Sequence, residues 1–276
     1  MGGIIDNLEN AINIWNEKLA EIWLLLTQTP QNFKGGNIWK VITQIHGGLL
    51  AIGLALLVLF FVVGMVKTCT NLTEIKRPEH ALRLFLRFAI ARGLVVYGMD
   101  VMCKIFEIVQ EITSKIMKTV GVGTVTSTKI PETIVEAVDD CGFLESIPVW
   151  AVTLLGGIFI TILSFVLILT VYGRFFRLYM YTAISPIPLS ASASESTQSV
   201  AITFLKSYIG VCMEGAIIVL ACIIFSKFAG SSPSIDEEAS AISMLWTYIG
   251  EIVFNMLVLV GTVKMSDRVV KDMMGL

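Results

Sequence analysis

The feature that most constrains this chain is a stretch of 26 residues, 147–172, without a single charged side chain. An α-helix rises about 1.5 Å per residue, so this stretch reaches about 39 Å and exceeds the roughly 30 Å hydrocarbon thickness of a bilayer. Further apolar stretches occupy residues 45–66, about 84–106, about 204–226 and about 241–263. The pattern predicts an all-α, polytopic membrane protein with about five transmembrane helices.

The composition supports the same fold class. Of the 276 residues, 55% are hydrophobic and 15% are charged, with a mean hydropathy of +0.79. Soluble domains carry about 25% charged residues, so this chain has too little polar surface for a soluble fold. The net charge of −2 excludes a global electrostatic attraction to nucleic acid, and any such attraction would have to be local.

Basic side chains gather after the first, third and fifth stretches, whereas the connections 104–146 and 227–240 are acidic. The basic residues beside these three stretches are Lys67, Lys76, Arg77, Arg83, Arg174, Arg177, Lys264, Arg268 and Lys271. Lysine and arginine are enriched in cytoplasmic loops, and five crossings put all three junctions on that side. We therefore predict the cytoplasmic membrane, with the N-terminus outside and the C-terminus inside.

Four regions follow from this topology. Residues 1–36 form an extracytoplasmic amphipathic helix and turn, and residues 37–106 form transmembrane helices 1 and 2 with a basic cytoplasmic loop. Residues 107–146 form an acidic extracytoplasmic loop. Residues 147–276 form transmembrane helices 3 to 5, with a proline-broken element on the cytoplasmic side and a basic C-terminal tail.

The N-terminal region carries one apolar stripe at alternating spacings of three and four, which is typical of an amphipathic helix. Its members are Ile5, Leu8, Ile12, Trp15, Leu19, Ile22 and Leu26. Because the opposite face is polar, we expect this helix to lie along the membrane surface or to present the stripe to a partner helix. Packing against the protein's own membrane domain is the alternative. The acidic N-terminus also lacks the basic region that begins a signal peptide.

After the charge-free stretch, the chain places two arginines and then two prolines close together. Arg174 and Arg177 lie at the predicted cytoplasmic end of the third span, where they suit anionic headgroups or phosphate. Residues 178–190 are apolar but too short to cross, and Pro186 and Pro188 remove two backbone donors. Irregular backbone at membrane depth is tolerated only where protein or a water-filled cavity covers it. This predicts a bent or re-entrant element, with an interfacial elbow as the alternative.

Five charged residues fall within predicted spans: Arg87, Arg92, Asp100, Glu214 and Glu251. An ionised group at mid-bilayer costs about 2.5–3.5 kcal/mol on insertion scales, so each needs a partner or water. Glu214 and Glu251 lie near the middle of antiparallel predicted helices, and they would line a polar pathway or make interhelical contacts. Arg87 and Arg92 are expected to snorkel to the cytoplasmic interface, and Asp100 to face water on the outer side.

Sequence motifs of catalysis and cofactor binding are missing. The chain contains no GxxxxGK[ST], HExxH or GxSxG, and His46 and His80 are too far apart in sequence to indicate a metal site. Cys103 and Cys141 flank the acidic connection and would pair in an oxidising compartment, although two free thiols are the simpler alternative. We therefore expect no enzyme, no cofactor and no bound metal.

The layout of these features, together with the segment GRFFRLYMYTAISPIPL at Gly173–Leu189, resembles a known family. The family is that of the TrbL-like polytopic inner-membrane subunits of conjugative type IV secretion systems, in the short form of Gram-positive conjugative elements. The resemblance implies a non-enzymatic part of a DNA-transfer channel that forms a ring, with a pentamer implied by the family. Its implied partners are other secretion subunits, including secretion ATPases, and transiently the transferred single-stranded DNA.

In this family the outer loop between the second and third spans is implicated in contact with the substrate, which corresponds to residues 107–146 here. That region is acidic and would repel DNA. The basic inner mouth suits a polyanion better, although membrane lipids also attract such residues; it comprises Lys76, Arg77, Arg83, Arg87, Arg92, Arg174 and Arg177. One alternative is a permease or ion-conducting subunit that uses Glu214 and Glu251. Another is a scaffold that recruits partners through the N-terminal helix.

Overall fold

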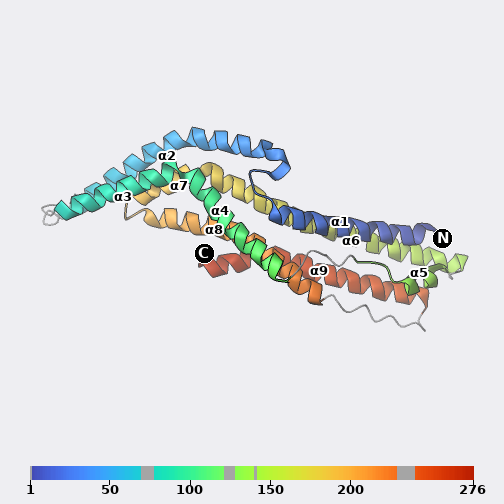
Figure 1. Cartoon of the computed structure of the whole chain (residues 1–276). Helices are drawn as coiled ribbons and strands as arrows, with labels where there is room; N and C mark the ends of the chain where they lie inside the picture. The colour runs from blue at the N-terminus through green and yellow to red at the C-terminus, as the bar shows by residue number, and fades with distance from the viewer. Residues whose placement is uncertain (1, 70–77, 121–127, 140–141, 229–239) are drawn as a thin grey trace. The chain divides into compact units, whose positions relative to one another are not determined.

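The computed structural model describes residues 2–69, 78–120, 128–139, 142–228 and 240–276, and all regular structure among them is helical (Figure 1). The helices in chain order are α1 (Gly2–Thr27), η1 (Phe33–Gly36), α2 (Asn37–Cys69), α3 (Pro78–Val96), α4 (Gly98–Val120), α5 (Glu132–Asp139), α6 (Phe143–Ile184), α7 (Pro186–Ser190), η2 (Ala191–Ala193), α8 (Gln198–Phe228) and α9 (Ala241–Met274). The prediction of an all-α protein is confirmed.

Four helical segments in the described part of the chain are long and apolar enough to cross a membrane. They are Phe33–Lys67, Ser146–Ile184, Gln198–Phe228 and Ala241–Met274. These segments confirm the class of polytopic membrane protein, but the expected crossing at about 84–106 is not among them. That region belongs to two helices, because α3 ends at Val96 and α4 begins at Gly98. Its charged side chains interrupt the apolar sequence, which explains why it differs from the other four.

The connection expected at 107–146 also contains regular structure. The helix α4 continues to Val120, and α5 occupies Glu132–Asp139. One face of α4 is buried, with Met102, Phe106 and Val109 at helical spacing. The apolar residues of α4 recur every three or four positions even where the sequence between them is polar. This spacing allows the helix to continue beyond the predicted span with one buried face.

The chain forms two compact units, each assembled from three separate segments. Unit 1 comprises Met1–Thr27, Thr113–Gly173 and Ile217–Ser266, and unit 2 comprises Gln28–Ile112, Arg174–Ala216 and Asp267–Leu276. The helices α4, α6, α8 and α9 each contribute to both units.

In unit 1, α1 runs beside α6 in the same direction (Figure 1). The backbone oxygen of Asn7 lies 3.3 Å from the position of a Cβ built on Gly157. Fourteen residues later on α1, the carboxylate of Glu21 accepts a hydrogen bond from the hydroxyl of Tyr172. These contacts are 14 residues apart on α1 and 15 on α6, so the helices stay together over roughly 21 Å.

The apolar stripe of α1 is covered within unit 1. Its buried members are Leu8, Ile12, Trp15, Leu19, Ile22 and Leu26, joined by Ile4, Ala11 and Leu25, whereas Ile5 is half-buried. This arrangement favours packing against the protein's own membrane domain over presentation of the stripe to a partner. A stripe of this kind indicates that an apolar surface must cover it, but not whose surface.

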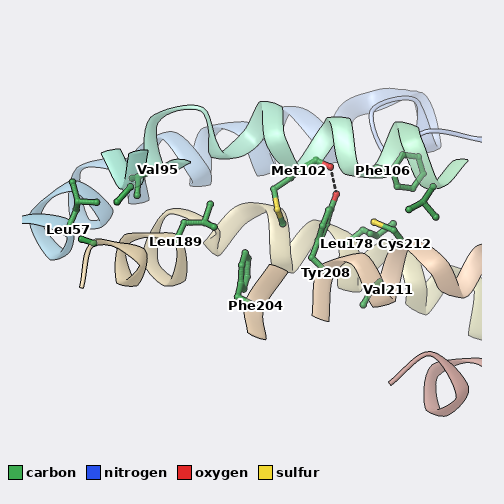
Figure 2. Close-up of a cluster of buried hydrophobic side chains, with 13 residues drawn as sticks. Leu57, Val95, Met102, Phe106, Leu178, Leu189, Phe204, Tyr208, Val211 and Cys212 are labelled. Carbon is green, nitrogen blue, oxygen red and sulfur yellow. Dashed lines mark hydrogen bonds between the residues drawn. The ribbon is translucent and has the colours of Figure 1, made fainter. Parts of the chain in front are cut away.

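Unit 2 has a core in which α2, α3 and α4 meet α8 and the final part of α6 (Figure 2). The cluster of buried side chains is spread along these helices and includes Leu57, Val95, Met102, Phe106, Leu178, Leu189, Phe204, Tyr208, Val211 and Cys212. The hydroxyl of Tyr208 donates a hydrogen bond of 2.9 Å to the carbonyl oxygen of Met102, which satisfies the polar group of this buried ring. The core therefore ties α8 to α4.

Candidate functional site

A cluster of charged side chains joins three helices inside unit 2. From α6, Arg177 donates through Nη2 to Oε2 of Glu214 on α8 at 2.6 Å, and through Nη1 to Oδ1 of Asp267 on α9 at 2.7 Å. The side chain of Glu214 is 2% exposed and that of Arg177 is 32% exposed. A planar guanidinium suits this arrangement, because its two terminal nitrogens can serve two carboxylates in fixed directions. One arginine thus holds three helices together.

The outer edge of this cluster is less enclosed. Lys271 lies one helical turn after Asp267 and donates to its Oδ2 at 2.8 Å. The Lys271 side chain is 56% exposed, so this pair stabilises the fold by less than about 1 kcal/mol. The cluster therefore has a buried centre at Glu214 and an accessible edge at Lys271.

A second guanidinium lies deeper than the first. Arg174 is 2% exposed, and its Nε and Nη2 atoms have no hydrogen-bond partner among the described residues. Its Cζ atom lies 5.1 Å from the ring centroid of Phe175, a distance at which a cation is attracted to an aromatic face. The other contact is with Gly215, where an added Cβ would collide with Nη1 of Arg174. Glycine at 215 therefore provides the space that the guanidinium occupies.

These positions change the prediction for the two arginines of α6. We expected Arg174 and Arg177 to meet headgroups or phosphate at a cytoplasmic mouth, but Arg174 is enclosed and Arg177 is engaged by two carboxylates. Arg177 binds Glu214 and Asp267 because a buried charge requires a partner of opposite charge. These two carboxylates belong to helices that are distant from Arg177 in sequence. No pattern within residues 173–189 could reveal these partners.

The remaining basic residues of the predicted mouth lie apart from this cluster or outside the described part. Lys76 and Arg77 fall outside the described residues. Arg83 and Arg92 are exposed on α3, and Arg87 donates from Nη2 to Oε1 of Gln198 at 3.2 Å. Arg87 also lies 3.5 Å from the exposed carboxylate of Glu195. Among the described basic residues of the predicted mouth, Arg83 and Arg92 on α3 therefore remain exposed.

The two acidic residues predicted for a pathway have different surroundings. Glu214 belongs to unit 2 and is bound by Arg177, whereas Glu251 belongs to unit 1 and is half-buried. Asp100 is exposed at the start of α4. Glu214 therefore acts as an interhelical contact, which is one of the two roles that the sequence left open.

The proline-broken element lies next to this cluster in the chain and is surrounded by protein. The helix α6 ends at Ile184, and Pro186 is the first residue of α7. A Cβ built on Gly53 of α2 would lie 2.7 Å from the backbone oxygen of Pro186, and one on Gly64 would lie 2.8 Å from Oγ of Ser194. Both glycines allow α2 to approach the broken segment closely. The contacts provide the protein cover that an irregular backbone needs at membrane depth.

His46 lies beside the same element. It is 6% exposed and its Nε2 atom has no partner among the described residues. Its Nε2 and the Oγ of Ser185 lie 3.9 and 3.7 Å from a Cβ built on Gly98, so α2, α4 and the end of α6 meet there. The apolar sequence after His46 indicated a span, but it could not indicate that α4 covers this histidine.

Among the residues that the structure describes, a metal site would require several ligating side chains close together. Within these residues there is no group of three or more His, Cys, Asp or Glu side chains that could hold a metal ion. Gln31 donates a hydrogen bond of 3.3 Å to the Sγ atom of Cys103. Cys141, with which Cys103 would pair, lies outside the described residues.

Sequence reasoning missed two members of the charge cluster. Asp267 and Lys271 were part of a predicted basic tail, and their spacing of four residues on a helix was the available signal for a pair. The role of Gly215 had no such signal, because a glycine within an apolar helix fits many packing arrangements.

The geometry is that of a membrane protein whose polar groups hold helices together. Comparison with protein families matches residues 15–186 to the family described as TrbL/VirB6 plasmid conjugal transfer like protein. Comparison with curated proteins and with solved structures gave no match. The matched range extends from α1 to the first residue of α7 and covers more than half of the chain. The chain therefore belongs to the TrbL/VirB6 family of conjugal transfer proteins and is a membrane subunit of that machinery.

Proposed function

We propose that this protein is a structural channel subunit of a conjugative type IV secretion machine, which oligomerises in the cytoplasmic membrane to line or scaffold the DNA path. The family match carries this proposal, since residues 15–186 include the second half of α1, the first candidate span and the start of the helix break. The charge cluster supports a structural role, because its buried carboxylate is used to hold helices together. The protein itself carries out no reaction.

The proposed partners are other secretion subunits, including secretion ATPases that supply energy, and further copies of this chain in a ring of five. Transferred single-stranded DNA would be a transient partner. The accessible arginines Arg83 and Arg92 of α3 are better placed for a polyanion than Arg174, which protein encloses. Membrane lipids compete for the same basic surface.

The proposed orientation keeps the N-terminus outside and the C-terminus in the cytoplasm. It requires an odd number of crossings, whereas the described residues contain four candidate spans, so one further segment must also cross. A reporter fused to each end tests this topology. Opposite compartments for the two reporters agree with the proposal, and one shared compartment contradicts it.

A permease that uses Glu214 and Glu251 is not favoured. A transport site requires a carboxylate that is free to exchange protons or bind solute, but the two terminal nitrogens of Arg177 are already shared between Glu214 and Asp267. The engagement of Glu214 is the observation against this alternative.

A clean deletion of the gene in donor cells tests the function. We expect DNA transfer to recipient cells to be abolished and to return when the wild-type chain is supplied in trans. A matched pair of exposed substitutions, Arg83→Glu and Arg92→Glu, should reduce transfer if α3 contacts DNA, while membrane levels of the protein stay unchanged. An unchanged transfer frequency in the deletion strain would reject the proposed function.

A ring of five copies makes a separate prediction. Crosslinking in intact membranes should give a largest product near five times the 30.3 kDa of one chain. A ladder that ends at two copies would contradict the ring while leaving the role in DNA transfer open to the deletion test.

A further inference from the structure

The long helix α6 and its neighbour α1 expose opposite chemistry at the same level of unit 1. In the charge-free stretch, α6 exposes large apolar side chains at Ile147, Trp150, Leu154, Leu155, Ile158, Phe159, Ile162, Phe165 and Leu169. In α1, the exposed residues at helical spacing include Asp6, Glu9, Asn10, Asn13 and Glu17. An apolar face of this size needs hydrocarbon or another apolar surface, whereas the α1 face needs water or polar groups.

The register between the helices places these faces side by side. Asn7 lies at Gly157 and Glu21 at Tyr172, so paired positions differ by 150 or 151 in residue number. Asn13 therefore lies level with residues 163–164, close to Ile162, whose side chain is 52% exposed. If a bilayer surrounds the charge-free stretch of α6, the polar face of α1 lies at the same depth in that bilayer.

The exposed residues of this polar face differ from the half-buried Asn16 beside them, which binds Thr128 of unit 1. Asp6, Glu9 and Glu17 make no ion pair in the described part of unit 1, whereas Lys18 and Glu21, nearer the buried side, pair with each other at 2.8 Å. Three carboxylates that form no ion pair among the described residues would be costly to place in hydrocarbon, whereas water solvates them. Their like charge also favours water over a closely packed second copy of the same face, where they would repel one another.

We propose that the polar face of α1, from Asp6 to Glu17, lines a water-filled path at membrane depth, with α6 as the lipid-facing helix of unit 1. This inference deepens the proposed channel role and rests on it. The stripe of α1 that packs in unit 1 anchors the helix, so the opposite face is held toward water. The α1 surface of this path carries carboxylates and amides, so it attracts cations and repels a polyanion.

Cysteine accessibility tests the inference with a matched pair of positions. Asn13→Cys and Ile162→Cys are introduced separately into a chain whose five native cysteines are replaced by alanine. Intact cells and inverted membrane vesicles are treated with a charged, membrane-impermeant maleimide, and the labelling rate of each cysteine is measured. We expect Asn13→Cys to react at least tenfold faster than Ile162→Cys from one or both sides, and both to react equally after denaturation in detergent.

Two outcomes would overturn the inference. If both cysteines react slowly, another surface covers the polar face of α1; if both react rapidly, this part of α6 lies in bulk water. Asn10→Cys serves as a second exposed position on the same face in case Asn13→Cys does not accumulate in the membrane. DNA transfer is measured in the same cells, and transfer that persists without labelling of α1 rejects the water-filled path but not the proposed function.

Discussion

The two units of this protein differ in where their polar side chains lie. In unit 2, Arg177 and Glu214 meet inside the protein, and Arg174 is enclosed beside Gly215. In unit 1, the polar side chains of α1 lie on its outer face, while its apolar stripe is buried. The comparison shows two arrangements of polar residues in one chain: paired charges hold helices together in unit 2, whereas the polar face of α1 remains exposed in unit 1.

Unit 1 also uses polar side chains to hold a connection. Asn16 of α1 donates through Nδ2 to the backbone oxygen of Thr128 at 3.0 Å and accepts from the backbone nitrogen of Thr128 at 3.1 Å. The hydroxyl of Tyr248 on α9 donates to the backbone oxygen of Lys129 at 3.0 Å. In unit 1, neutral amide and hydroxyl groups thus hold the backbone before α5. In unit 2, by contrast, charged side chains connect the helices.

The largest effect is expected from Arg177→Ala in unit 2. The substitution leaves the carboxylate of Glu214 buried without a cation, and the loss of one partner of a buried pair costs about 3–5 kcal/mol. Because Arg177 is 32% exposed, we expect a value near the lower end of this range. Thermal unfolding of the purified protein in detergent measures the change.

The control for that prediction is Lys271→Ala at the exposed edge of the same cluster, which should change stability by less than about 1 kcal/mol. Equal losses for the two substitutions would contradict the distinction between a buried centre and an accessible edge. The double variant Arg177→Ala with Glu214→Gln should recover part of the loss, since position 214 then carries no buried carboxylate.

A smaller effect is expected from Gly53→Ala on α2. The new Cβ would lie 2.7 Å from the backbone oxygen of Pro186, which cannot withdraw as a flexible side chain would. Crowding of this kind typically costs about 1–3 kcal/mol. Limited proteolysis near residues 186–196 and thermal unfolding would both report a displaced break.

The matched control is Gly47→Ala on the same helix, where nothing lies within 4 Å of the added Cβ. This variant should be as stable as the wild type or slightly more stable, because alanine favours a helix. If Gly53→Ala behaves in the same way, the close approach of α2 to the break does not contribute to stability.

The smallest effect is expected from Asn16→Ala in unit 1. Two hydrogen bonds to Thr128 are lost, which costs about 1–2 kcal/mol in total, because water replaces them in part. Hydrogen exchange of the Thr128 amide should become faster. Asn13→Ala removes an exposed amide from the same helix and should leave that exchange rate unchanged, whereas equal acceleration by both would point to a general loosening of α1.

The class of the protein and its family could be predicted from local sequence. Stretches without charged residues indicate helices that cross lipid, since hydrocarbon offers no partner to a charge. The predicted class of helical membrane protein and the predicted family are confirmed by the candidate spans and by the family match. The same local reasoning expected one span at 84–106. The structure instead has two helices, α3 and α4, on either side of Tyr97, and neither is among the candidate spans.

The sequence by itself determined that this chain is helical, that it belongs in a membrane and that its backbone is interrupted by closely spaced prolines near residue 186. Only the tertiary structure decided that Arg177 binds Glu214 and Asp267, that Gly215 leaves space for Arg174 and that α1 lies beside α6. The physical reason is that the affinity of a segment for lipid is a sum over neighbouring residues. The partner of a buried charge, in contrast, depends on which distant helices come into contact.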